Sequence, residues 1–166
     1  MGAFQVVEVG EGIEQTIRSA LSHWNVLRAS GTEERPALLT ISPKAVTYPC
    51  SLPESCRTIL LPGDAKEVMQ GIQAASVVSY GPSARDSLTL SSHQENRLLV
   101  ALQRELVTID GQVVERQEFP LHQPTGLSTW STLAAVGTLL MLGVPPEELM
   151  EGGSIQLGLE SWSKEG

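Results

Sequence analysis

The stretch Ser131-Thr-Leu-Ala-Ala-Val-Gly-Thr-Leu-Leu-Met-Leu-Gly-Val144 is the longest apolar run of the chain, and Pro145-Pro-Glu-Glu-Leu149 follows it directly. A membrane-spanning helix needs about 20 apolar residues, so this shorter run predicts a helix buried against a sheet. Gly143 marks its expected end, because glycine readily adopts the left-handed conformation that stops helices. Proline and two acids then indicate the first turn of another helix. Two helices are therefore expected to meet at Gly143-Val144.

The length and composition favour one folded domain. The chain has 166 residues, of which 41% are hydrophobic and 18% charged, and this is enough to bury a core without disulfides or metals. We expect a single domain over residues 1–155. The Gly- and Ser-bearing segment 156–166 is expected to be a flexible C-terminal tail.

The net charge limits the possible partners. The chain carries a formal net charge of −8, and its Lys and Arg residues are scattered, so binding to nucleic acid or to a membrane is not expected. The first residues, Met-Gly-Ala-Phe-Gln-Val-Val-Glu, lack the basic and apolar regions of a secretory signal. A cytoplasmic location is therefore expected.

The cysteines and histidines form no pattern typical of a metal site or a catalytic triad. Cys50 and Cys56 are the only cysteines, and they are interpreted as ordinary reduced residues because no zinc-ligand spacing accompanies them. The three histidines are His23, His93 and His122. They lack sequence-local acids or nucleophiles in a triad arrangement, so we interpret them as surface or half-buried residues.

The first half of the chain predicts strands alternating with helices. Strands are expected at 4–9, near the centre of the sheet, and at 37–41, 58–61 and 76–80, and a helix is expected from Ile13 to about Leu27. A second helix is predicted over 65–72, with Asp64 as N-cap and Glu67 completing a capping box. This succession favours a parallel βαβ unit with a right-handed crossover.

The second half predicts an antiparallel hairpin. Residues 87–91 alternate polar and apolar side chains, residues 97–109 form one extended run, and Asp110-Gly111 is typical of a two-residue type I′ turn. Such a turn predicts the pairs Ile109 with Gln112, Val107 with Val114, Glu105 with Arg116, and Leu102 with Phe119. Apolar residues and opposite charges then face each other.

Acidic residues follow several of the predicted strands. Glu8, Asp64 and Asp86 lie at strand ends or just after them, where parallel α/β sheets place ligands, although capping and turn formation explain Asp64 and Asp86 equally well. Neither GxGxxG nor GxxxxGK[ST] occurs in the sequence, so no phosphate-binding loop is predicted. The segment Glu8-Val-Gly-Glu-Gly12 is interpreted as a tight turn after a strand.

Several motifs from about Leu38 to Met150 follow one another in an order found in a known family. They are Thr40-Ile-Ser-Pro43, Ile59-Leu-Leu-Pro-Gly-Asp64, Val77-Val-Ser-Tyr-Gly81, Gly126-Leu-Ser-Thr-Trp-Ser-Thr-Leu-Ala-Ala135 and Leu142-Gly-Val-Pro-Pro-Glu147. In this order and spacing the chain resembles the central domain of the Mur ligases, the ATP-dependent amino-acid ligases of peptidoglycan synthesis. The resemblance implies an α/β domain of bacterial origin.

The departures from the family concern the residues that handle nucleotide. Ser128 and Ser131 stand where the family has two asparagines, one of which meets adenine, and the family's P-loop is missing. Glu8 matches a magnesium-binding glutamate only by position. The resemblance and the strand ends together give Glu8, Asp64, Ser128 and Ser131 as candidate ligand-binding residues, with no catalytic residue, metal ligand or cofactor expected.

These observations predict an α/β fold of three layers, whose mixed sheet has a parallel βαβ part and an antiparallel hairpin extension. The expected function is that of a non-catalytic Mur-ligase-like domain, a binding, regulatory or assembly module. The alternative is a subunit of an ATP-dependent ligase whose P-loop a partner supplies. In both cases a protein partner is expected, and a second copy of the chain, in a homodimer, is one candidate.

Overall fold

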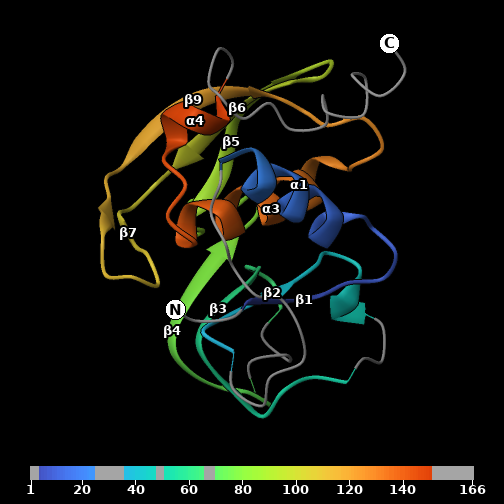
Figure 1. Cartoon of the computed structure of the whole chain (residues 1–166). Helices are drawn as coiled ribbons and strands as arrows, with labels where there is room; N and C mark the ends of the chain where they lie inside the picture. The colour runs from blue at the N-terminus through green and yellow to red at the C-terminus, as the bar shows by residue number, and fades with distance from the viewer. Residues whose placement is uncertain (1–3, 25–35, 48–50, 66–69, 151–166) are drawn as a thin grey trace.

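The computed structural model describes residues 4–24, 36–47, 51–65 and 70–150. They form a seven-stranded sheet in the order β1-β2-β3-β4-β5-β6-β9, with a separate two-stranded ribbon of β7 and β8 (Figure 1). The strands are β1 (Phe4–Val7), β2 (Leu38–Ile41), β3 (Ser55–Pro62), β4 (Gln73–Tyr80), β5 (Leu88–Gln94), β6 (Arg97–Leu102), β7 (Leu106–Val107), β8 (Val113–Val114) and β9 (Gln117–His122).

The sheet is mixed. Neighbouring strands from β1 to β5 run parallel, whereas β5, β6 and β9 pair antiparallel. The predicted mixed α/β sheet, with a parallel part followed by an antiparallel part, is therefore confirmed. The expectation that the first strand lies near the centre is wrong, because β1 pairs only with β2 and forms an edge of the described sheet.

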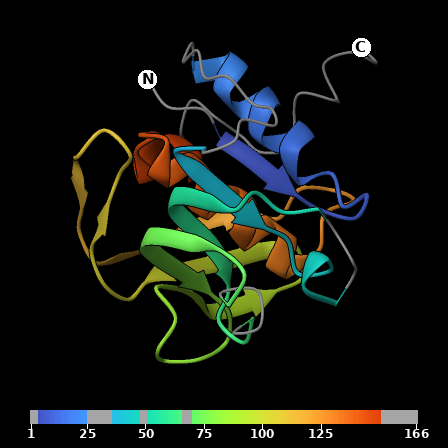
Figure 2. The same cartoon turned by 90° about the horizontal axis from the view of Figure 1, so that it is seen from below.

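Two helices cover one face of the sheet. They are α1 (Ile13–Trp24) and α3 (Thr129–Met141), which pack against each other (Figures 1 and 2). The apolar stripe of α1, which includes Ile13 and Ile17, belongs to the same buried cluster as the leucines of α3. Every residue of α3 from Ser131 to Met141 is buried. The organising apolar run is thus the central helix of the larger core, as its sequence predicted.

The other face of the sheet buries a smaller cluster. Leu39 and Ile59 project to this face and pack with Ala45 of the short 3-10 helix η1 (Ala45–Thr47) and with Ala65 and Ile72. Within the described residues, η1 and the segments around Ala65 and Ile72 cover this face. Half of the predicted helix over 65–72, residues 66–69, lies outside the described residues, as do Glu67 and the predicted tail 156–166. Its described residues, 65 and 70–72, are not helical.

Both ends of α3 are capped, and the Gly143 stop is the one that the sequence predicted. Ser128 is the N-cap and accepts a hydrogen bond from the Ser131 N–H at 3.1 Å. At the other end Gly143 has φ +102°, and the Val144 N–H donates to the Leu139 carbonyl at 3.0 Å, as in a Schellman stop. Helix α4 (Pro146–Leu149) then begins at the expected proline. The predicted meeting of two helices at Gly143-Val144 is confirmed.

The antiparallel extension differs in register from the prediction. The run 97–109 is interrupted after β6, and the ribbon pairs Leu106 with Val114 and Val107 with Val113, one position away from the predicted pairing. Between β6 and β9 the difference is larger, because Leu102 faces Gln117 and Phe119 faces Val100. In Figures 1 and 2 the ribbon lies at the periphery of the molecule.

The turn itself explains the register. The Gly111 N–H donates to the Thr108 carbonyl at 2.9 Å, and the Thr108 N–H donates to the Gln112 carbonyl at 2.8 Å. The pair Thr108 and Gln112 therefore encloses a three-residue loop. Gly111 has φ +88°, whereas Asp110 is not in the positive-φ region that a type I′ turn requires. The predicted type I′ turn is therefore wrong, but the hairpin is confirmed, and Gly111 has the positive φ that a type I′ turn would also require.

Gly111→Val is expected to lower the free energy of unfolding by about 1–2 kcal/mol, because a β-branched residue resists the left-handed conformation. No atom lies within 4 Å of a Cβ at this position, so the loss would come from the backbone and not from a steric clash. Urea unfolding of the two proteins measures it. Gly111→Asn should lose less, since asparagine tolerates this region; equal stability of wild type and Gly111→Val would contradict the observed turn.

Candidate ligand-binding site

The parallel strands bring their carboxyl ends to one edge of the sheet. Glu8 follows β1, Pro43 follows β2, Asp64 follows β3 and Gly81 follows β4. The beginning of α3 contributes Trp130 to the same region. Carboxyl ends of parallel strands are where α/β sheets place ligands, so this edge is the candidate site.

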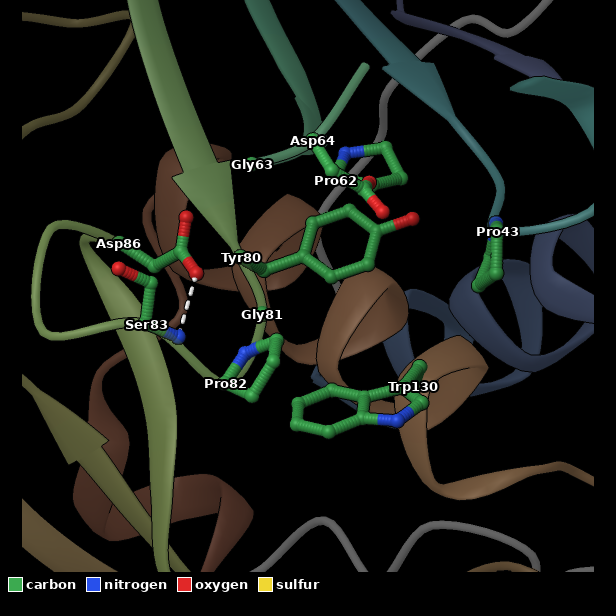
Figure 3. A pocket seen from close by; sticks show the side chains of 10 residues that line it. All are labelled: Pro43, Pro62, Gly63, Asp64, Tyr80, Gly81, Pro82, Ser83, Asp86 and Trp130. Carbon is green, nitrogen blue, oxygen red and sulfur yellow. Dashed lines mark hydrogen bonds between the residues drawn. The ribbon is translucent and has the colours of Figure 1, made fainter.

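A pocket of about 410 Å³ lies at this edge. Its walls are shown in Figure 3 and consist of Pro43, Pro62, Gly63, Asp64, Tyr80, Gly81, Pro82, Ser83, Asp86 and Trp130. The volume is at the small end of the range for ligand pockets, which is about 300–1,000 Å³. Half of these ten lining residues are prolines or aromatic residues, and the charged ones among the ten are two aspartates.

Tyr80 forms the floor of the pocket at the end of β4. Its side chain is buried, and its hydroxyl donates a hydrogen bond to the Ile41 carbonyl at 2.7 Å. Burial raises the pKa of Tyr80 far above its ordinary value, and the negative charges of Glu11 and Asp64 raise this pKa further. The phenol therefore stays neutral and ties the end of β4 to the end of β2.

Asp86 is held in the turn after β4. The side chain is only 3% exposed, and its Oδ2 accepts a hydrogen bond from the Ser83 N–H at 3.0 Å. The carboxylate lies so close to the backbone that a Cβ on Gly63 would be 1.9 Å from Oδ1 and one on Gly81 would be 2.6 Å from Oδ2. The turn-forming interpretation of Asp86 is confirmed, and it explains why glycine occupies both neighbouring positions.

Glu8 caps helix α1. Its Oε1 accepts a hydrogen bond from the Ile13 N–H at 2.8 Å, and its Oε2 accepts one from the Glu14 N–H at 3.0 Å. These N–H groups belong to the first turn of the helix, which has no intrahelical partners for them. A carboxylate is favoured there by the helix dipole. Both oxygens of Glu8 are therefore engaged with the chain's own backbone.

Glu11 connects the loop after β1 to the rest of the edge. Its Oε1 accepts hydrogen bonds from the Val9 N–H at 3.0 Å and from the Ser42 hydroxyl. Its Oε2 accepts from the Lys44 N–H at 3.2 Å and from the Ser131 hydroxyl at 3.3 Å. One carboxylate thus joins the ends of β1 and β2 to the first turn of α3.

The predicted site residues have different positions at this edge. Asp64 lines the pocket, whereas Glu8, Ser128 and Ser131 do not. Ser128 caps α3 and Ser131 binds Glu11, while Trp130, which lies between them in sequence, reaches the pocket. Sequence reasoning missed Glu11, Tyr80 and Trp130 as site residues. Trp130 could have been singled out from the sequence only because it is the aromatic residue of the motif 126–135.

The remaining histidines and cysteines form no further site within the described residues. His93 and His122 are exposed, as expected, and the side chain of His23 lies outside the described part. Within that part, no three His, Cys, Asp or Glu side chains are placed to hold a metal ion together. Cys56 is buried in β3, and Cys50 lies outside the described residues.

Among the helices described, none has the length and apolar character needed to cross a membrane.

No protein-family model and no curated protein matches this chain. The similarity to the Mur ligase central domain therefore stays a prediction, and the function has to be inferred from the geometry of the site.

Proposed function

We propose that this chain is a non-catalytic binding module built on a Mur-ligase-like scaffold in a bacterium. The observation that carries the proposal is the contact of the Glu8 carboxylate with the Ile13 and Glu14 N–H groups at 2.8 and 3.0 Å. Nucleotide-binding α/β proteins use such N–H groups, at the start of the helix after the first strand, to bind phosphate. Here the chain's own carboxylate occupies them.

The charges around the loop support the same conclusion. A phosphate approaching the start of α1 would have to displace Glu8 and would also meet the negative charge of Glu11. Glu11 already accepts a hydrogen bond from the hydroxyl of Ser131. Ser131 stands at one of the two positions where the family carries asparagine. A phosphate-binding loop needs backbone donors and a lysine that are free to approach the ligand. Repulsion between the carboxylates and a triphosphate would make binding unfavourable.

The alternative proposal is that a partner subunit supplies the P-loop of an ATP-dependent ligase. This alternative requires nucleotide to bind at the interface between this chain and the partner. A neighbouring gene that encodes a P-loop protein would allow the two chains to be purified together. ATP hydrolysis by the pair, absent from either chain alone, would favour the ligase over the binding module.

Titration calorimetry with Mg-ATP tests the proposed function. We expect no measurable binding by the isolated chain at millimolar nucleotide concentrations, and no ATP hydrolysis. Mg-ADP and inorganic phosphate should also give no measurable heat of binding, because Glu8 excludes the phosphate group in each case. Micromolar affinity for Mg-ATP would overturn the non-catalytic proposal.

A further inference from the structure

We propose that the pocket at the carboxyl edge of the sheet binds a small organic cation, in which an ammonium group is carried by a compact apolar body. This inference deepens the proposed function, because it rests on the chain being a binding module and names the chemical class of its ligand. It is carried by three features of the pocket: its aromatic rings, its charge and its size.

Trp130 provides most of the accessible aromatic surface that a cation needs, because the side chain of Tyr80 is only 1% exposed. Trp130 is half-buried at the start of α3, and the ring of Tyr80 is buried at the end of β4. Figure 3 shows both rings bordering one space, together with the rings of Pro43, Pro62 and Pro82. Tryptophan and tyrosine faces attract ammonium groups through their negative quadrupoles. The proline rings are rigid apolar surface against which methyl or methylene groups can pack.

The charge of the pocket selects against anions. Among the described residues, its lining contains the carboxylates of Asp64 and Asp86 and no Lys, Arg or His. Asp64 is exposed at the rim, and Asp86 lies within the wall. Glu11 adds a further negative charge close enough to influence Tyr80. In a chain whose net charge is −8, these groups concentrate a negative potential in a concave site, where it attracts cations.

The dimensions favour a small molecule over a polymer. A pocket of about 410 Å³ holds one compact ligand. The polar groups of the wall are largely committed to the protein: the Tyr80 hydroxyl donates to Ile41, and Asp86 accepts from Ser83. Recognition would therefore rely on charge and ring contact more than on directional hydrogen bonds. A quaternary ammonium group, which has no N–H to donate, fits this chemistry.

Choline and its neutral isostere 3,3-dimethylbutan-1-ol provide the test, since they differ essentially in charge. Each is titrated into the full chain while the indole N–H signal of Trp130 is followed by NMR. The signal is assigned by its absence in Trp130→Phe. We expect choline to shift this signal in a saturable manner, and the isostere to bind at least about fivefold more weakly, as loss of a cation–π contact implies.

Two matched variants distinguish the effect of a charge in the pocket on choline binding from the effect of the protein's net charge. Asp64→Asn should weaken choline binding by about two- to fivefold, as expected for a partly exposed ion pair. Glu95→Gln removes the same charge at the exposed turn between β5 and β6, at the opposite end of β5 from Tyr80, and should leave the affinity unchanged.

Three results would overturn the inference: no shift of the Trp130 signal, equal affinity for choline and the isostere, or equal losses in Asp64→Asn and Glu95→Gln. Each of these would leave the proposed function intact. That proposal fails only if the chain binds or hydrolyses Mg-ATP.

Discussion

Leu139→Ala is expected to lower the free energy of unfolding by about 2–5 kcal/mol, a large part of the stability of a domain of this size. Leu139 is fully buried in α3, within the cluster that joins this helix to α1 and the sheet. Truncating it removes apolar contacts and leaves a cavity that close-packed neighbours fill only in part. Urea unfolding followed by circular dichroism measures the change.

Val107→Ala is the matched control, because it also truncates an aliphatic side chain but at a position that is 56% exposed. This variant should lie within about 0.5 kcal/mol of the wild type. If Leu139→Ala were as stable as Val107→Ala, α3 would not be the centre of the core.

Gly63→Ala is expected to cost about 2–4 kcal/mol, because the new methyl group would collide with the Asp86 carboxylate. A Cβ at this position would lie 1.9 Å from Oδ1 of Asp86. Asp86 would have to leave its buried position and lose the hydrogen bond from the Ser83 N–H. Overpacking and loss of a charge-assisted hydrogen bond together give a loss of this size.

A double-mutant cycle with Asp86→Ala isolates the collision. Once the carboxylate is removed, Gly63→Ala should cost much less than it does in the wild type, giving a coupling free energy of about 1–3 kcal/mol. Additive losses in the double variant would show that Gly63 is required for a reason unrelated to Asp86.

The elements set by local pattern were predicted well from the sequence. The apolar run 131–144, its Gly143 stop and the Pro146 start of α4 depend on side chains close together in sequence, and the structure places them as expected. The strands that became β2, β3 and β4 were predicted for the same reason, although β3 and β4 extend further toward their N-terminal ends than expected.

The order and register of the strands depend on non-local contacts, and there the predictions failed. β1 is an edge strand because nothing in the described chain pairs on its other side, a fact that its apolar sequence does not reveal. The hairpin register was shifted because Ile109, Asp110 and Gly111 form a three-residue loop. Loop length fixes register, and the same Asp-Gly pair is compatible with either length.

The candidate site was predicted only in part. Asp64 was recognised because an acid after a strand end is a local pattern, and it does line the pocket. Trp130 and Glu11 were missed because their roles arise from contacts between distant segments, such as the 3.3 Å contact between Glu11 and Ser131. Strand-end acids therefore locate the edge of the sheet, but not the side chains that other elements bring to it.

The central claim is that the Glu8 carboxylate occupies the N–H groups at the start of α1, which nucleotide-binding α/β proteins use to bind phosphate. An NMR titration of the isotope-labelled protein with Mg-ATP tests it most directly, by following the amide signals of Ile13 and Glu14. We expect these two signals to stay unchanged at millimolar nucleotide, because both N–H groups already donate to Glu8. Saturable shifts of both signals at micromolar Mg-ATP would contradict the claim and favour the ligase reading.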